Sequence, residues 1–277
     1  MDYKRILTMQ DISCFGQCSL TVALPILSAC GVETVILPSA VLSTHTGGFT
    51  DFTFRDLSDD IPAISAHWQK EGIDFDAIYT GYLGSIKQID MVKDIFEKHI
   101  RAGGVKIVDP AMADNGKLYY GFDQAYADAM ATLCSKADLV LPNITEVCFM
   151  TGMEYKETYD EAYVMSLLSA LENKGINNVI LTGVSYSSET TGVLVKTNGN
   201  VQYYSHKRIP VGSHGTGDVF ASAFSGALLN GKSEFDSAKV AAEYTLRCIE
   251  NTQGDDSHKY GVKFETAIPY LIELLGK

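Results

Sequence analysis

Short apolar, β-rich runs that alternate with longer helical patterns constrain the fold of this 277-residue chain more than any other feature. We predict strands in six such runs, over residues 5–10, 34–37, 77–80, 105–108, 139–141 and 179–182. Helices are expected over residues 19–30, 86–102 and 160–174, because glycine follows each pattern and commonly ends a helix. This alternation favours a mostly parallel sheet with helices on both faces and ligands outside the carboxyl ends of its strands.

The pattern changes after residue 182. Two β-rich runs, 191–197 and 201–206, flank Asn198-Gly199-Asn200, which is a hairpin signal and predicts a small antiparallel edge. Helical patterns return over residues 219–229, 237–250 and 264–275. Residues 40–61 lack a helical period and are expected to form a lid or extra strands. Because no linker composition interrupts the chain, we expect a single domain over residues 1–277.

Charge and apolar patterning bear on the class of partner. The chain has 22 Lys and Arg residues against 34 Asp and Glu residues, and its net charge of -12 opposes binding to nucleic acid or to an anionic membrane. No run of 18 apolar residues and no signal-peptide pattern appears, so a cytoplasmic location is expected. The six cysteines form no C-x-x-C pair, which argues against a zinc site or a disulfide framework. Cys14 and Cys18 flank a suspected ligand loop, and a reactive thiol there is the minor alternative to buried packing.

The segment Gly215-Thr216-Gly217-Asp218 combines anion recognition with a carboxylate. If a helix begins near Gly217, its free N–H groups and positive dipole end would face a phosphate, and the two glycines would allow close backbone approach. Asp218 has two interpretations. It is either a first-turn residue stabilised by the helix dipole or a base directed at a hydroxyl nucleophile.

Two other phosphate-binding strings are excluded by their context. Residues 226–233 match G-x-x-x-x-G-K-[ST], but they continue a helix instead of following a strand, and Gly231 is a helix stop. The run from Gly215 lacks the third glycine of a dinucleotide fingerprint, because Phe220 occupies that position. A nicotinamide-dependent enzyme is therefore not indicated.

Polar residues follow the predicted strands at four places, residues 11–13, 109–114, 143–146 and 215–218. Singly, Asp109-Pro110 is a turn, and Asn143 with Glu146 is a capping-box variant before a helix. A parallel sheet brings such strand-end loops into one crevice. Together these segments therefore predict a site.

At this point the chain resembles the ribokinase-like superfamily and, within it, the vitamin B6 kinases (the pyridoxal, pyridoxine and pyridoxamine kinase family). The resemblance spans nearly the whole chain. It rests on the Gly-Thr-Gly-Asp segment, Asp109-Pro110, Pro142-Asn143-x-x-Glu146, Ser43-Thr-His-Thr46 and Thr80-Gly-Tyr-Leu-Gly-Ser85. It implies a three-layer α/β/α fold and an ATP-dependent kinase that phosphorylates the 5′-hydroxymethyl group of a B6 vitamer.

The resemblance also implies roles for individual residues. Asp218 would be the base that deprotonates the acceptor hydroxyl, and the N–H groups of Gly215, Thr216 and Gly217 would hold the developing negative charge. ATP would be bound by Asp109, Asn143, Glu146, Thr182, Gly215, Thr216 and Gly217. Glu146 and Asp109 would organise Mg²⁺, and a monovalent cation such as K⁺ and a homodimer are further implications.

On the substrate side, the matching positions are Asp11, Ser13, His45, Thr46, Gly47, Tyr82 and Asp218. Their ordinary structural alternatives are a loop histidine, a core tyrosine and, for Asp11, a helix cap. Better-known pyridoxal kinases have Ser-His where this chain has Asp11-Ile12. Hydroxymethylpyrimidine kinases of thiamine synthesis have an aspartate in that loop, so they are the alternative enzyme, and a noncatalytic vitamin- or nucleotide-binding protein is the alternative outside enzymes.

Overall fold

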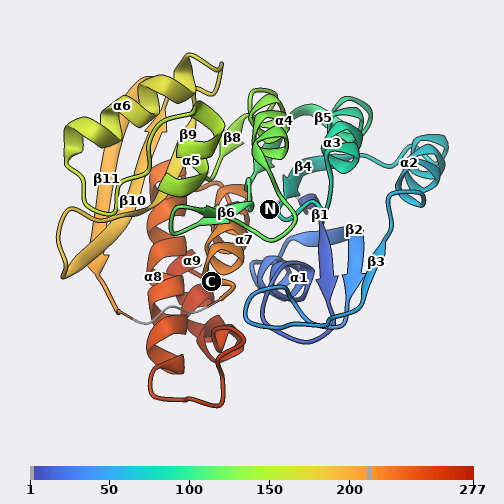
Figure 1. Cartoon of the computed structure of the whole chain (residues 1–277). Helices are drawn as coiled ribbons and strands as arrows, with labels where there is room; N and C mark the ends of the chain where they lie inside the picture. The colour runs from blue at the N-terminus through green and yellow to red at the C-terminus, as the bar shows by residue number, and fades with distance from the viewer. Residues whose placement is uncertain (1–2, 211–213) are drawn as a thin grey trace.

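The computed structural model describes residues 3–210 and 214–277 and is built around one large sheet (Figure 1). Within these residues the sheet has nine strands in the order β11-β10-β9-β8-β5-β4-β1-β2-β3. The strands are β1 (Arg5–Ser13), β2 (Glu33–Leu42), β3 (Phe54–Asp56), β4 (Phe75–Thr80), β5 (Ile100–Val108), β8 (Leu139–Val140), β9 (Val179–Val184), β10 (Thr190–Thr197) and β11 (Asn200–Lys207). Strands β2, β1, β4, β5, β8 and β9 are parallel, whereas β3, at one edge, and the β10–β11 hairpin, at the other, add antiparallel pairs. The predicted mostly parallel sheet with an antiparallel edge is confirmed.

Helices cover both faces of this sheet. One layer holds α2 (Ile61–Lys70), α3 (Ile86–His99), α4 (Gln124–Cys134), α5 (Ile144–Thr151) and α6 (Glu161–Glu172), and the other holds α1 (Leu20–Ala29), α7 (Thr216–Leu229), α8 (Glu234–Thr252), a 3₁₀ turn (Phe264–Ala267) and α9 (Ile268–Leu275). Strand β1 shows how one strand serves both layers. Leu7 and Met9 pack with the first layer and Ile6 with the second, because successive side chains point to opposite faces. Each of these buried side chains contributes about 1.5–3 kcal/mol.

One predicted helix boundary needs adjustment. The helix expected over residues 86–102 ends at His99, and Ile100, with an extended backbone (φ -81°, ψ 132°), begins β5. Gly103 has φ 78° and lies inside this strand, so its left-handed conformation marks an irregular strand segment and not a helix stop. Residues 40–61 contain the end of β2 and the added strand β3, as the extra-strand alternative predicted.

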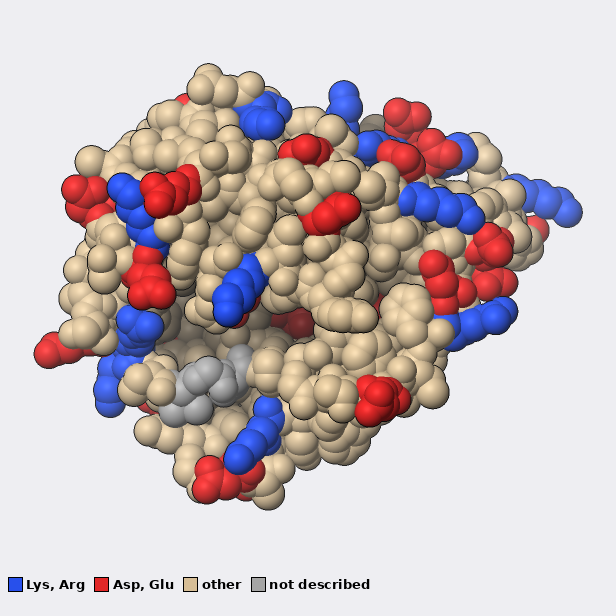
Figure 2. Space-filling model, in the orientation of Figure 1, with Lys and Arg blue, Asp and Glu red and all other residues tan. Residues whose placement is uncertain are grey.

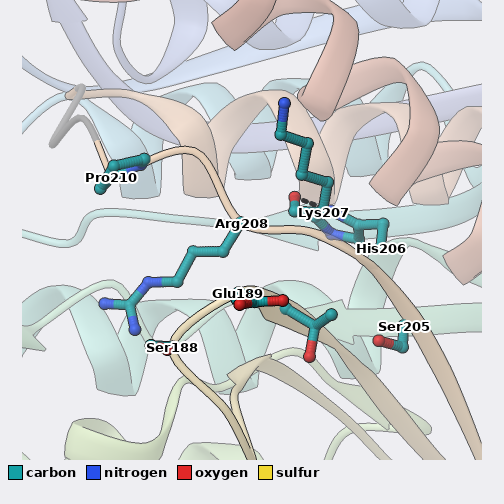
Figure 3. Close-up of a pocket in the computed structure, with 8 residues that line it drawn as sticks. Ser188, Glu189, Ser205, His206, Lys207, Arg208 and Pro210 are labelled. Atoms are coloured by element: carbon teal, nitrogen blue, oxygen red, sulfur yellow. Dashed lines mark hydrogen bonds between the residues drawn. The ribbon is translucent and has the colours of Figure 1, made fainter.

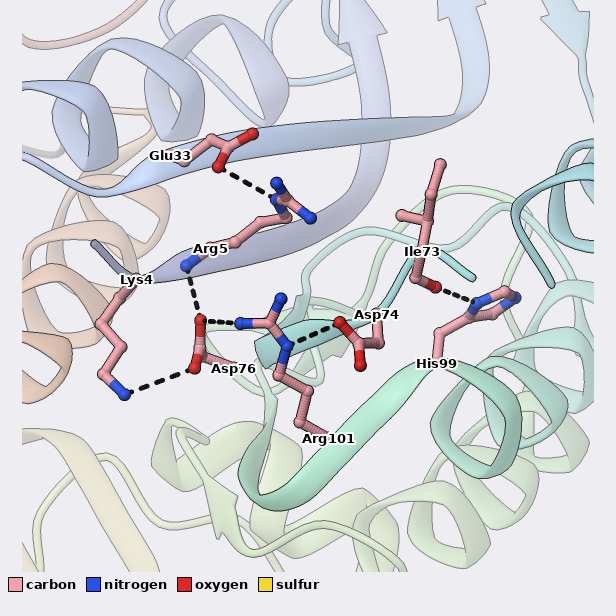
Figure 4. A network of polar contacts seen from close by, with 8 residues as sticks. All are labelled: Lys4, Arg5, Glu33, Ile73, Asp74, Asp76, His99 and Arg101. Atoms are coloured by element: carbon pink, nitrogen blue, oxygen red, sulfur yellow. Dashed lines mark hydrogen bonds and ion pairs between the residues drawn. The ribbon is translucent and has the colours of Figure 1, made fainter. Parts of the chain in front are cut away.

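An ionic network ties strands β1, β4 and β5 together at their amino ends, opposite the carboxyl ends (Figure 4). Asp76 accepts hydrogen bonds from the backbone N–H of Arg5 and from the Arg101 guanidinium, both at 2.8 Å. Arg101 also donates to Asp74 at 2.6 Å, and Lys4 donates to Asp76 at 3.3 Å. These bonds lower the pKa of Asp76 despite the opposing effect of burial. The network fixes strand register at the end of the sheet that carries no cavity residues.

Among the helices of the part described, none combines the length and apolar character needed to cross a bilayer.

Candidate active site

A cavity of about 600 Å³ opens at the carboxyl ends of the parallel strands. Figure 2 shows a hollow in this face of the molecule with acidic atoms at its back. Every residue that the sequence assigned to the site lines the cavity: Asp11, Ser13, His45, Thr46, Gly47, Tyr82, Asp109, Asn143, Glu146, Thr182, Gly215, Thr216, Gly217 and Asp218. They come from loops or ends of six neighbouring strands and from the first turns of α5 and α7, so the sheet brings them together as expected.

The strand order gives this cavity two ends. Asp11, His45 and Tyr82 follow or end β1, β2 and β4, which are neighbours on one side of the sheet. Thr182 lies on β9 at the other side. There the wall is completed by Val193 of β10 and by the α8 residues Ala242, Thr245 and Ile249. We call these the polar end and the apolar end.

Helix α7 begins between the two ends and presents its first turn to the cavity. Gly215 precedes it with φ 76°, and its carbonyl accepts the Val219 N–H at 3.0 Å. A Cβ at Gly215 would overlap the carbonyl oxygen of Gln17, so only glycine fits there. Gly217 has open space beside it. The N–H groups of the first turn have no intrahelical acceptor, which makes this segment an anion cradle.

The carboxyl group of Asp218 lies in that first turn and is partly buried in the cavity. Burial raises its pKa to about 7, and the charges of Asp109 and Asp11 add to the shift, while a hydrogen bond with the Ser19 backbone opposes it. A carboxyl group with a pKa near neutrality can accept a proton from a hydroxyl nucleophile more readily than an ordinary aspartate. The geometry therefore suits Asp218 to general-base chemistry next to a bound phosphate.

Asp109 and Glu146 form a pair of buried acids at the centre of the cavity. Burial raises the pKa of Asp109 to about 7 and, together with the charge of Asp109, raises that of Glu146 well above its usual range. Glu146 accepts the backbone N–H of Met112 at 3.1 Å and that of Asn143 at 2.8 Å, and the Asn143 side chain accepts the Glu146 N–H at 2.9 Å. This is the predicted capping box of α5.

The same acid pair matches the chemistry of a magnesium subsite. The backbone N–H of Ala111 donates to Oδ1 of Asp109 at 3.2 Å. In the described ranges, no cluster of three or more His, Cys, Asp or Glu side chains could hold a metal by itself. Mg²⁺ is ordinarily held by one or two carboxylates together with phosphate and water, so two adjacent acids beside an anion cradle fit it. A cation there would offset the repulsion between the two carboxylates.

At the polar end, His45 is held by backbone groups on both ring nitrogens. Nδ1 accepts the N–H of Gly47 at 3.1 Å, and Nε2 lies 2.8 Å from the carbonyl oxygen of Tyr260. A carbonyl can only accept, so Nε2 carries the proton and the ring is neutral. Burial lowers the pKa of His45, consistent with this tautomer. His45 therefore orders the loops, and its ring face is what it can offer to a ligand.

Several cavity residues were not predicted. The short hairpin of β6 (Ala113–Asp114) and β7 (Lys117–Leu118) contributes Asp114 and is followed by Tyr119 and Tyr120. Its Asn115-Gly116 turn is a strong hairpin signal that could have revealed it. Ser19, His206 and His214 also line the cavity, and no local sequence signal marks them.

A second, more open hollow of about 660 Å³ lies at the end of the β10–β11 hairpin (Figure 3). Lys207 and Arg208 line it, and Figure 3 shows their side chains pointing away from each other. Its only carboxylate among the described lining residues is Glu189. These divergent side chains converge on no common point, so this hollow is not a candidate for the chemistry.

Comparisons with known proteins agree with the fold. Residues 23–262 match the phosphomethylpyrimidine kinase family. A Bacteroides thetaiotaomicron protein described as a phosphomethylpyrimidine kinase, solved with pyridoxal, is 36% identical with a TM-score of 0.92, covering 98% of this chain and 96% of its own. Pyridoxal kinase from Lactobacillus plantarum is 31% identical with a TM-score of 0.89, over 98% and 97%. Pyridoxine/pyridoxal/pyridoxamine kinase from Bordetella avium is 26% identical over 266 residues, 91% of this chain and 86% of that protein.

Proposed function

The chain belongs to the phosphomethylpyrimidine kinase family, and we propose that it is an ATP- and Mg²⁺-dependent pyridoxal kinase, which phosphorylates the 5′-hydroxymethyl group of pyridoxal, pyridoxine or pyridoxamine. The observation that carries the proposal is the position of Asp218. Its carboxyl group, with a pKa near 7, sits in the first turn of α7 between the buried acids and the polar end of the cavity. The relatives named as pyridoxal kinases support the choice of substrate.

In this proposal the acceptor occupies the polar end and the nucleotide the apolar end, near Thr182. Asp218 takes the proton of the acceptor hydroxyl as its oxygen forms a bond to the γ-phosphorus and the bond from that phosphorus to the β–γ bridging oxygen breaks. The first-turn N–H groups from Gly215 to Asp218 stabilise the charge on the transferred phosphoryl group. A positioned base of this kind contributes roughly 10²–10⁴-fold to the rate.

Asp109 and Glu146 would hold Mg²⁺ with the phosphates, and Asn143 would keep Glu146 in place through the capping box. When bound, the metal neutralises phosphate charge and orients the reacting groups. Both acids of the pair are buried and neither has a Lys or Arg partner among the described residues that line the cavity. This surplus of negative charge is the reason to expect that the nucleotide binds as its magnesium complex.

A second candidate is phosphorylation of hydroxymethylpyrimidine, favoured by the name of the matched family and by Asp11 at the polar end. The deciding comparison is kcat/KM for the three vitamers and for the pyrimidine alcohol, measured with ATP and Mg²⁺. We expect at least one vitamer to be the best substrate. Strong turnover of the pyrimidine alone would reverse the assignment, and no phosphorylation of either class would favour a binding protein.

We further propose that residues 1–277 act as one kinase domain in a cytoplasmic homodimer and that K⁺ supports activity. Light scattering of the purified chain tests the dimer. Replacement of K⁺ by Na⁺ in the assay tests the monovalent cation.

A further inference from the structure

Asp11 is a buried carboxyl group that has no cationic partner among the residues the structure describes. Asp11 is only 3% exposed, and the Ser13 hydroxyl donates to its Oδ2 at 2.8 Å. The cavity lining, within the described ranges, contains no lysine or arginine. Buried carboxylates are normally paired with a cation or fully hydrogen-bonded, because transfer of an isolated charge from water is costly. Asp11 therefore presents negative charge to the cavity that the protein itself does not compensate.

The surroundings of Asp11 show the same imbalance. Burial raises its pKa, and the hydroxyl groups of Ser19 and Ser13 only partly oppose the shift. Burial, and then the charge of Asp11, raises the pKa of Tyr82 to about 12. The charge of Asp11 also contributes to the raised pKa of Asp218. The charge of Asp11 thus raises the pKa values of Tyr82 at the polar end and of the base Asp218, and no lysine or arginine among the described lining residues neutralises it.

The position of Asp11 relative to Asp218 limits what a ligand can present to it. In the proposed function, the acceptor's hydroxymethyl group meets Asp218 and its ring lies at the polar end, which Asp11, Ser13 and Tyr82 line. A serine or a backbone N–H at this place could donate to a neutral pyridine nitrogen. An ionised carboxylate can only accept, so it requires an N–H on the ring.

We propose that Asp11 selects the acceptor by pairing with its protonated ring nitrogen, so that this kinase binds its vitamer as the pyridinium form. The inference rests on the proposed function and deepens it by naming the ionic form of the substrate. Ser13 fixes the orientation of the carboxylate through its bond to Oδ2. The ring takes its proton from water, and the charge-assisted hydrogen bond that results is stronger than one between neutral groups.

The test is equilibrium binding without nucleotide, measured by calorimetry. Its probes are pyridoxine and the carbocyclic analogue in which C–H replaces the ring nitrogen. We expect the wild-type protein to bind pyridoxine roughly 10- to 100-fold more tightly than the analogue, as for a buried hydrogen bond to a charged group. The variant Asp11→Asn should lose most of this preference and bind the analogue within about threefold of wild type. Equal affinity of the wild type for both probes would overturn the proposal.

The ultraviolet absorption of bound pyridoxine gives a second readout, because it reports the protonation of the ring. The wild type and Ser13→Ala, which keeps the carboxylate, should both show the protonated ring, whereas Asp11→Asn should show the neutral ring. Asp51→Asn, an exposed residue on the loop after β2, is the matched control and should behave as wild type. A neutral ring on the wild-type protein would overturn the inference even if an Asp11 variant failed to fold.

The outcome is separable from that of the proposed function. If the wild type phosphorylates pyridoxine but binds it with a neutral ring, the role of Asp11 is wrong and the kinase assignment stands. If the wild type neither phosphorylates nor binds any vitamer, both are wrong.

Discussion

The imidazole of His214 lies against the backbone of Gly47, so that a Cβ at this glycine would be 2.6 Å from Nδ1 of the ring. The rings of His214 and His45 are also close, with centroids 5.3 Å apart. His214 immediately precedes Gly215 of the anion cradle, whereas Gly47 belongs to the loop at the polar end. This contact joins the two parts of the cavity between which a phosphoryl group would be transferred.

Replacement of Gly47 by alanine should therefore impair turnover without unfolding the protein. The added methyl group would push the His214 ring and, through it, Gly215. We expect kcat/KM for the vitamer to fall roughly 10- to 100-fold, as overpacking commonly costs about 1–3 kcal/mol. In the double variant Gly47→Ala, His214→Ala the clash is removed, so part of the loss should be recovered. Strictly additive losses in this cycle would show that the contact carries no coupling.

Asp109→Asn should raise the requirement for magnesium. Asparagine retains an oxygen that can accept the Ala111 N–H, but it removes one of the two central charges. We expect the Mg²⁺ concentration for half-maximal activity to rise by roughly tenfold or more, the scale of one lost charge-assisted contact. Titration of activity with Mg²⁺ measures it, with Asp128→Asn on the exposed side of α4 as control. An unchanged magnesium titration would remove Asp109 from the metal subsite.

Stability should depend on pH through Asp218. Its pKa in the folded protein is about 7, above its ordinary value of 3.8, so the folded state binds this proton more tightly than the unfolded state. The stability that the protonated Asp218 contributes is fully present below about pH 4 and is lost as the pH rises through 7. Without ligands or divalent ions, Asp218→Asn should match wild type near pH 4 and exceed its unfolding free energy by roughly 4 kcal/mol at pH 8. Urea titrations at the two pH values measure the difference, and a pH-independent offset would refute the shift.

The sequence predicted the parts of the fold that depend on local pattern. The parallel strands and the β10–β11 hairpin carry apolar runs and turn residues that are readable along the chain. Helices α2 and α4 were missed. Asp60, the N-cap of α2, makes no side-chain cap hydrogen bond, whereas Asp123 caps α4 by accepting the Tyr126 N–H at 3.0 Å and is a local signal for that helix.

The site was predicted where strand ends bring residues together, because strand order alone places Asp11 and Asp109 at the same edge of the sheet, and the glycine-flanked start of α7 adds Asp218. Contacts made across the cavity were outside the reach of the sequence. His45 makes a hydrogen bond to the carbonyl oxygen of Tyr260, which is 215 positions away, and no local sequence pattern predicts this partner. The pKa of Asp218 likewise depends on burial, which only the packed structure provides.

The most direct test of the account is the turnover of Asp218→Asn with ATP, Mg²⁺ and the best vitamer, measured beside Asp128→Asn. We predict that kcat falls by roughly 10²–10⁴-fold while the dissociation constant for ATP changes little, because the variant loses the base but keeps the cradle. A kcat equal to that of the wild type would contradict the central claim that Asp218 deprotonates the acceptor.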